Sequence, residues 1–380
     1  MKKTALAAVL LLLWPLGAWG QQAKDAGRWQ ERLNLTGALE MDLHWEEGPQ
    51  GEGASSLSLG TLELGAEVDI VPWLKGFLLL LAEDLGTSEA TDLTVDEATL
   101  TLQRPDSPFY LVLGKRVQPF GLFENHLVAD PWVQDAYETN RVGLTAGYRG
   151  PMDMDVSLTV YGGQEHLEHL FGSGLFDAQA VARRGEASED VEAFIIAASF
   201  KPLQNRFFHL VAFGSYLSEP GRGRRNQSLD VGLSLAPPVL EGLRLDVEYA
   251  RALRRELYEG LQEEFREAVL SATLAYEFVL REREVLGGGL FMARRAHLMA
   301  EPLELALRYE YFDDDGLAEA TGSFSAKDRL AVGARYTFLQ EGPLVAFLAA
   351  ELYRTTYRVA SGLSMDDEAQ GLRFRLGLSF

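Results

Sequence analysis

The stretch VDEATLTLQRPDSPFYLVLGKRVQPFGLFENHLVADP, residues 95–131, decides the fold of this chain. It contains two strand-like runs, Leu93 to Gln103 and Phe109 to Val117, joined by Pro-Asp-Ser-Pro. Pro and Asp favour a tight reversal, so the spacing predicts a β-hairpin. The long connection that follows, Gln118 to Asn140, is of mixed polarity. We therefore expect a hairpin followed by a loop with a structure of its own.

A two-residue period recurs along most of the chain. From Arg32 to His44, apolar residues occupy one parity and polar residues the other. Successive side chains of a strand point to opposite faces, so this pattern predicts strands with one apolar and one polar face. Sixteen segments of roughly ten residues are expected to be strands, the length that a tilted strand needs to cross a bilayer. These segments are residues 32–44, 57–70, 74–84, 93–103, 109–117, 141–149, 153–161, 192–200, 207–216, 229–236, 243–251, 270–279, 303–312, 330–338, 344–353 and 372–380.

The connections between these segments alternate between long and short. Outer-membrane barrels have tight periplasmic turns and longer external loops, so the alternation favours a barrel of this kind. It also makes Gln118 to Asn140 the third external loop. The connection Leu280 to Glu301 departs from the pattern, because it should be a short turn but has about twenty residues. It either extends the two flanking strands or forms a separate ordered excursion.

The N-terminus has the features of a secretory signal peptide. Lys2 and Lys3 precede an apolar run, and small residues at Ala18 and Gly20 offer a cleavage site. We expect export to the cell outer membrane of a Gram-negative bacterium. The expected organisation is a signal peptide over residues 1–20, a short periplasmic segment over 21–31, and an antiparallel transmembrane β-barrel over 32–380.

Composition excludes several kinds of chemistry. The chain has no cysteine, which excludes disulfides, thiolate metal sites and thiol nucleophiles. Its formal net charge of −21, or −23 without Lys2 and Lys3, argues against nucleic acid as a partner. His166 and His169 lack the His-Glu-x-x-His order of a zinc hydrolase, and no nucleophile elbow or phosphate-binding loop is evident. The sequence predicts neither a metal nor a cofactor, and no enzyme activity.

The polar parity is expected to line a pore. A sheet can cross hydrocarbon only if it closes, and sixteen strands leave an aqueous channel. A charge that faces lipid at the midplane costs about 2 to 4 kcal/mol for Arg or Lys, which favours the lumen. Each such charge can also belong to an ion pair that only stabilises the wall. The wall charges predicted at the pore or its constriction are Glu97, Arg116, Arg141, Arg149, Arg335, Arg373 and Arg375.

The acidic excess predicts a modest cation preference, but a basic cluster of arginines could reverse it. The cluster in question comprises Arg116, Arg141, Arg373 and Arg375. Arg116 is the weaker member, because its strand is apolar on both parities and Lys115 competes for the same role.

The third loop, residues 118–140, is expected to fold into the barrel. Pro119-Phe120-Gly121 makes a turn, and the loop has too many apolar residues to be freely solvated. In many sixteen-stranded porins the third loop narrows the pore, and the expectation here rests on that analogy. The loop residues predicted at the constriction are Phe120, Glu124, Asn125, His126 and Asp130.

The quoted stretch resembles a known family. Val95 to Leu102, Phe109 to Lys115 and Pro119 to Pro131 are similar to the siderophore porins of the legiobactin-uptake type, as are Leu35 to Glu40 and Thr61 to Gly65. The phosphate-selective porin O and P family is a more distant likeness, through Gly114-Lys115, Pro119-Phe120-Gly121, Arg308 to Asp313 and the last strand. Members of the siderophore family can carry a coiled-coil segment before the barrel, which Gln21 to Gln30 is too short to form.

The resemblance implies an outer-membrane porin that passes a small solute, such as an iron chelate. The partners then implied are outer-membrane lipid and that solute, with a homotrimer as a candidate assembly. A phosphate or general anion porin is an alternative. A barrel enzyme of the lipase type, or an adhesin with a plugged lumen, are alternatives of a different class.

Overall fold

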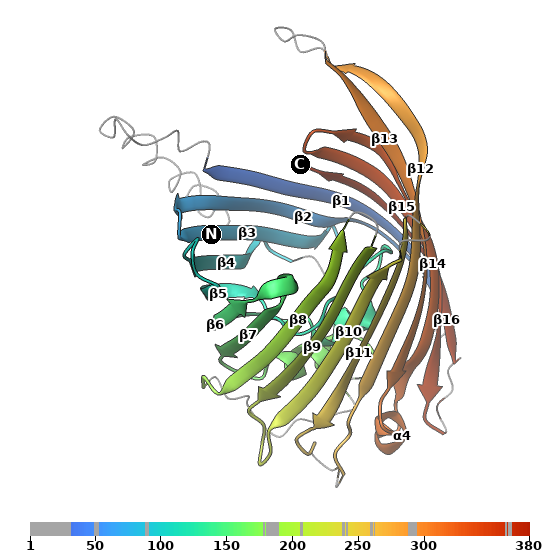
Figure 1. The fold of residues 1–380 in the computed structure, drawn as a ribbon. Helices are drawn as coiled ribbons and strands as arrows, with labels where there is room; N and C mark the ends of the chain where they lie inside the picture. Colours follow the sequence, from blue (N-terminus) through green and yellow to red (C-terminus); the bar gives the residue numbers. More distant parts are fainter. Residues whose placement is uncertain are drawn as a thin grey trace.

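The computed structural model describes residues 32–48, 53–87, 91–177, 179, 190–205, 208–237, 240, 242–258, 261, 263–287, 295–361, 363 and 367–380. Sixteen strands form one closed antiparallel barrel in which each strand pairs with its neighbours in sequence and β16 pairs with β1 (Figure 1). The expected segments 1–20 and 21–31 lie outside the described residues. The strands are β1 (Leu33–Glu47), β2 (Gly53–Val71), β3 (Leu74–Leu85), β4 (Thr94–Gln103), β5 (Phe109–Val117), β6 (Asn140–Arg149), β7 (Asp155–Tyr161), β8 (Ala193–Asn205), β9 (Phe208–Glu219), β10 (Asn226–Ala236), β11 (Leu243–Arg254), β12 (Ala268–Gly287), β13 (Arg295–Asp313), β14 (Phe324–Glu341), β15 (Leu344–Val359) and β16 (Glu368–Ser379).

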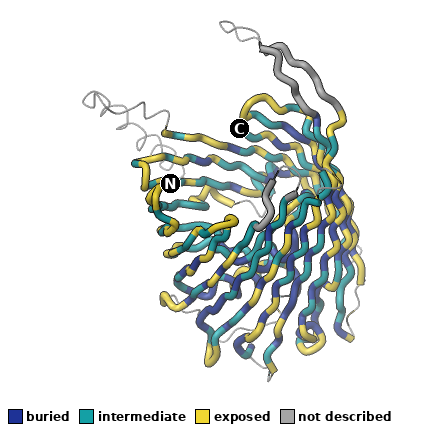
Figure 2. Tube along the Cα trace, in the orientation of Figure 1, coloured by how far each residue is buried: buried dark blue, intermediate teal, exposed yellow. Residues whose placement is uncertain are grey.

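The predicted two-residue period is expressed in the strands. On β1, Leu35, Leu39 and Met41 are exposed on the outer face, and Asp42 and His44 turn inward. Figure 2 shows exposed and more buried positions following one another along the strands. Polar side chains therefore collect inside the ring, where they can be hydrated or paired. Among the described residues, no helix is long and apolar enough to cross a membrane.

The strands differ in length around the barrel. Strands β4, β5, β6 and β7 have 10, 9, 10 and 7 residues, whereas β12 to β15 have 20, 19, 18 and 16. The predicted start of β7 at Asp153 is wrong, because Pro151–Asp153 is a 3-10 turn in which Met152 and Asp153 have φ of 57° and 50°. Those dihedrals lie outside the β region, so β7 begins only at Asp155.

The long connection between residues 280 and 301 extends its two flanking strands. Strands β12 and β13 continue their pairing to Gly287 and Arg295, beyond Tyr276, the last residue of β12 that pairs with β11. On β13, pairing with β14 reaches only as far as Leu303. Figure 1 shows this hairpin projecting past the rim of the barrel. Of the two alternatives left open by the sequence, the structure has the first.

A hydrophobic core lies inside the ring, where a fully open pore would have water. Two short helices take part and contact each other: α2 (Trp132–Tyr137) in loop 3, and α3 (Glu165–Gly172) in loop 4, the connection between β7 and β8. Loop 7 adds α4 (Leu317–Thr321). The buried cluster joins these helices to inward-facing strand residues, and its members include Phe120, Trp132, Val133, Tyr137, Leu167, Leu170, Ile195, Leu217 and Val269. External loops therefore fold into one part of the lumen and leave another part open.

Candidate functional site

Loop 3 lies against the inner wall formed by β10 to β15. It begins at Gln118, whose backbone N–H donates to the carbonyl of Thr139 at the loop's other end, at 2.9 Å. The first anchor on the wall is Glu248 of β11, which accepts the backbone N–H of Leu122 at 2.6 Å and of Phe123 at 3.0 Å. A carboxylate that accepts two backbone hydrogen bonds fixes both the position and the direction of the loop.

The middle of loop 3 is attached by His126. Its Nε2 lies 2.9 Å from Oδ2 of Asp246 on β11, and its Nδ1 lies 3.2 Å from Oε2 of Glu304 on β13. Burial alone would lower the pKa of His126, but hydrogen bonds to the two carboxylates outweigh it and raise the pKa to about 9. His126 is thus an imidazolium bridge at neutral pH.

The end of loop 3 is held by arginines of the wall. Arg308 of β13, which is fully buried, donates to Asn125 Oδ1 at 3.2 Å and to the carbonyls of Ala129 at 2.9 Å and Asp130 at 3.1 Å. Arg329 of β14 donates to the same Asp130 carbonyl at 2.9 Å. These contacts fix the position of the side of loop 3 that faces the rest of the lumen.

Loop 4 fills the space behind loop 3. Glu219 at the end of β9 accepts the N–H groups of His166 at 3.0 Å and Leu167 at 3.3 Å, the first turn of α3. A carboxylate there complements the positive end of the helix. The His166 ring lies 5.1 Å from that of Phe120, between centroids, and burial lowers the pKa of His166 well below its usual value. A neutral imidazole suits this apolar core.

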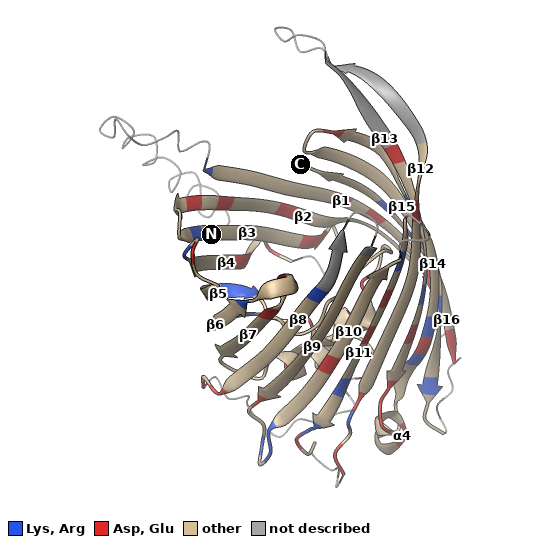
Figure 3. Cartoon of the chain, in the orientation of Figure 1, with Lys and Arg blue, Asp and Glu red and all other residues tan. Residues whose placement is uncertain are grey.

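The open part of the lumen is a cavity of about 590 Å³ between loop 3 and the strands β1, β2 and β16. A smaller cavity of about 160 Å³ shares Arg375 and Val128 with it and continues past the loop. Figure 3 shows acidic and basic positions close together on β14 to β16, along the wall that borders both. The charged residues that line the larger cavity are Asp42, Glu46, Asp84, Asp130, Asp135, Arg329, Arg373 and Arg375.

Charges that line these two cavities are arranged by the closure of the barrel. Arg375 of β16 donates from Nε and Nη2 to both carboxylate oxygens of Asp42 on β1, each at 2.8 Å, and its Nη1 lies 2.9 Å from Glu40. Two further arginines lie over aromatic rings: Arg373 is 4.7 Å from the Tyr353 centroid and Arg335 is 3.8 Å from that of Phe347. Stacking holds a guanidinium in place without neutralising it.

Several residues predicted from the sequence come together here. Arg335, Arg373 and Arg375 line the two cavities, as do Asn125, His126 and Asp130 of loop 3. Glu124 instead lines a small crevice between the loop and the wall, beside Asp246 and Glu248.

The remaining predicted residues lie elsewhere. Phe120 is fully buried in the hydrophobic cluster, so it anchors the loop and does not face the opening. Arg141 lies 3.2 Å from Glu165 of α3, and Arg149 lies 3.5 Å from Asp155 near the start of β7. Arg116 donates to the carbonyl of Val117 at the base of loop 3, and neither Arg116 nor Glu97 lines the two cavities.

Sequence reasoning missed Asp42, which lines the larger cavity, and Tyr353, whose ring lies under Arg373. Asp42 has the polar parity of the first strand, but its role depends on β1 pairing with β16, which places it opposite Arg375. Tyr353 lies on the more uniformly apolar β15, and its OH is 2.8 Å from Nε2 of His44. Parity within a single strand carries no signal for either contact.

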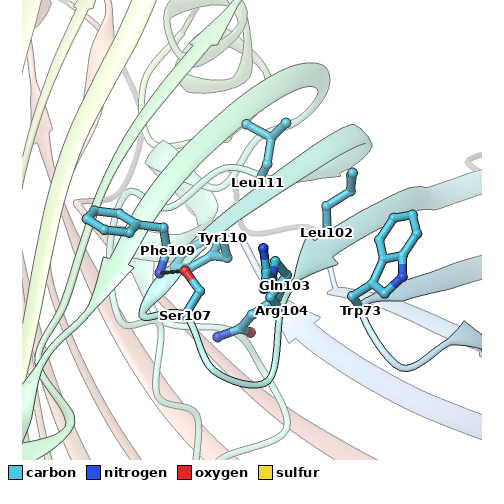
Figure 4. A pocket seen from close by; sticks show the side chains of 8 residues that line it. All are labelled: Trp73, Leu102, Gln103, Arg104, Ser107, Phe109, Tyr110 and Leu111. Atoms are coloured by element: carbon cyan, nitrogen blue, oxygen red, sulfur yellow. Dashed lines mark hydrogen bonds between the residues drawn. The ribbon is translucent and has the colours of Figure 1, made fainter.

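A larger apolar groove of about 740 Å³ is separate from the pore. It lies at the turns that join β2 to β3 and β4 to β5, and Figure 4 shows Trp73, Leu102 and Leu111 pointing to one side of it. Phe109 and Trp73 are 64% and 48% exposed, as expected on the outer surface of a barrel near its rim. This groove faces the surroundings of the barrel and takes no part in the constriction.

No family model and no curated protein matches the sequence. Solved structures do match: the outer membrane channel DcaP of Acinetobacter baumannii has a TM-score of 0.58 at 10% identity, covering 92% of this chain and 97% of that one. The anion-selective porin from Comamonas acidovorans has a TM-score of 0.57 at 11% identity, and the match covers 92% of this chain and 99% of that one. OmpT of Vibrio cholerae in its trimer form has a TM-score of 0.53 at 10% identity, and the match again covers 92% of this chain and 99% of that one. The chain has the fold of outer-membrane porins.

Proposed function

We propose that the protein is a porin of the outer membrane, giving passive passage to small hydrophilic solutes. The observation that carries the proposal is the charged cavity of about 590 Å³ left open between loop 3 and the β1–β2–β16 wall. Buried carboxylates and arginines fix loop 3 at many points, so the opening has a defined size and lining. A preformed polar constriction selects by size and charge, without a chemical step.

Ion conduction tests this function. Purified protein in planar bilayers is expected to give discrete channels in KCl, and protein that stays non-conducting at every voltage would refute the proposal in favour of an adhesin or structural barrel. Lipid hydrolysis that one Ser substitution abolishes would instead support the barrel enzyme.

Cation preference is the expected selectivity. The larger cavity is lined by five carboxylates and three guanidiniums, a formal excess of two negative charges, although burial raises the pKa of Asp135 to about 7 and its carboxyl is only partly ionised at neutral pH. The alternative is an anion porin, which is favoured by Arg335 and Arg373, since neither forms an ion pair with a carboxylate of the described residues. The Comamonas porin of similar fold is anion-selective. The reversal potential in asymmetric KCl distinguishes the two, because its sign reports which ion carries more current.

An iron chelate is the proposed cargo within this function, on the resemblance to siderophore porins. Liposomes that contain the protein are expected to take up a neutral or cationic ferric hydroxamate chelate faster than a sugar of equal size, because an anionic chelate would be repelled by the acidic lining. Uptake that follows size alone would leave a general porin.

A homotrimer is the proposed assembly. Strand β7 has 7 residues, whereas a tilted strand needs about 9 to 11 to cross a bilayer. Strands β4, β5 and β6, with 10, 9 and 10 residues, are the next shortest of the barrel. The short wall around β7 is better covered by protein than by lipid, so the β4–β7 side is the proposed contact between copies. Native mass spectrometry in detergent is expected to give three chains, and a monomer would refute it.

A further inference from the structure

Of the three arginines that line the larger cavity, Arg373 is the one with no ion pair among the described residues. Arg373 on β16 lies over the Tyr353 ring, and among the described residues no carboxylate lies within ion-pair distance of it and none accepts its hydrogen bonds. Its neighbours differ: Arg375 is held by Asp42 and Glu40, and Arg329 is paired with Glu310. The N–H groups of Arg373 are therefore the ones in the larger cavity that can receive a solute.

The orientation of Arg373 is fixed by the Tyr353 ring on which its guanidinium lies. Tyr353 has its OH 2.8 Å from Nε2 of His44, and the same His44 atom lies 3.7 Å from Oε2 of Glu46. This chain of contacts positions the aromatic ring, and the ring in turn holds the guanidinium flat. A planar guanidinium presents paired N–H donors along its edge, the geometry that binds a carboxylate in bidentate fashion.

The surroundings of Arg373 are acidic. Asp84 and Asp130 line the same cavity. Asp130 accepts a hydrogen bond from the amide of Asn125 on Oδ1 at 2.9 Å, and no side chain or backbone group of the described residues donates to its Oδ2. A purely anionic solute would be attracted by Arg373 but repelled by the acidic excess. A purely cationic solute would be attracted by the acidic side chains but repelled by Arg373. Only a solute that carries both charges satisfies Arg373 and the acidic side together.

We propose that the larger cavity selects small zwitterions, with the solute carboxylate on Arg373 and its ammonium group towards Asp130 and Asp84. This inference rests on the proposed channel function and does not depend on the iron-chelate cargo, to which it gives a competing solute class for the same site. The cavity volume of about 590 Å³ lies in the range of small-molecule sites, so an amino acid and its hydration water can be accommodated.

Four-carbon probes test the proposal without a change in size. Single-channel K⁺ current is recorded with 4-aminobutyrate, butyrate or butylammonium added at equal concentration, and binding is read from current interruptions. We expect 4-aminobutyrate to bind more tightly than both singly charged probes. In Arg373→Gln its affinity is expected to fall about tenfold, the loss of one charge-assisted contact in a partly buried site. In Arg373→Lys the affinity is expected to be intermediate, because the charge stays but the planar fork is lost.

The control is Arg104→Gln, which removes one positive charge from an exposed turn where Arg104 pairs with Asp106. It is expected to retain the wild-type preference. Equal binding of the three probes, or an unchanged preference in Arg373→Gln, would overturn the inference while leaving the channel intact. Absence of any K⁺ current would overturn the proposed function itself. Heat-modifiable migration on gels shows that each variant has folded as a barrel.

Discussion

Nε2 of His126 in loop 3 lies 2.9 Å from Oδ2 of Asp246 on the barrel wall. With Glu304 on its other nitrogen, the imidazole joins the loop to two strands, β11 and β13. Because the pKa of His126 in the folded protein, about 9, lies above the ordinary histidine value of 6.5, protonation favours the attached state. That contribution is fully present below pH 6.5 and is lost as the pH rises through about 9.

The first prediction follows from this titration. Open-channel current noise in planar bilayers is expected to be low at pH 7 and to increase by pH 10, as the loop loses its charged bridge. His126→Gln is expected to be noisy at both pH values. Noise that depends on pH equally in wild type and variant would assign the effect to another group.

A second prediction concerns Arg308, which is fully buried and donates to three acceptors of loop 3. Arg308→Met leaves the Ala129 carbonyl and Asn125 Oδ1 without these donors, whereas the Asp130 carbonyl keeps its hydrogen bond from Arg329. We expect a loss of about 3 to 5 kcal/mol in unfolding free energy, the usual cost of breaking a buried charged contact, and a larger single-channel conductance. Urea unfolding in detergent micelles measures the first and bilayer recording the second. The matched control Arg104→Met, at an exposed pair, should change neither.

A third prediction concerns the Asp42–Arg375 pair. Arg375→Gln leaves Asp42 and Glu40 uncompensated, so cation preference is expected to increase. Asp42→Asn frees the guanidinium and is expected to shift selectivity towards chloride. Reversal potentials across a KCl gradient measure both. Shifts of the same sign in the two variants would contradict this arrangement of charges.

A fourth prediction concerns α3 of loop 4, which fills part of the lumen behind loop 3. Leu167 of α3 is 1% exposed within the hydrophobic cluster. Leu167→Ala is expected to cost about 2 to 5 kcal/mol in stability, the range for a buried leucine, and to raise conductance because the helix loosens from the lumen. Leu363→Ala, at a 44% exposed leucine, is the control. Unchanged conductance with lowered stability would show that α3 does not border the ion path.

A fifth prediction concerns Gly114 on β5, where φ is 126° and an added Cβ would lie 2.0 Å from the carbonyl oxygen of Ala98. That backbone cannot move without breaking the β4–β5 pairing. Gly114→Ala is therefore expected to lower the yield of heat-modifiable barrel after refolding, whereas Gly53→Ala, which has open space, is not.

The strands and their faces were predictable from the sequence because a two-residue period is local. Leu39, Met41 and Leu43 alternate with polar residues, and any strand built from them has one apolar face. The same pattern predicted that Arg335 of β14 and Arg373 and Arg375 of β16 turn inward. Loop 3 was expected to fold inward because so many of its residues are apolar. The sequence did not show which loop residues face the opening: Phe120 was predicted at the constriction, and it is buried.

Only the tertiary structure decided which charges meet. Asp42 and Arg375 are 333 residues apart and become partners because the barrel closes between β1 and β16. His126 meets Asp246 and Glu304 because loop 3 crosses to the opposite wall. The alternation sets which face each side chain points to, a property of one strand. Closure and loop contacts depend on the register of strands far apart in the chain, which no local pattern encodes.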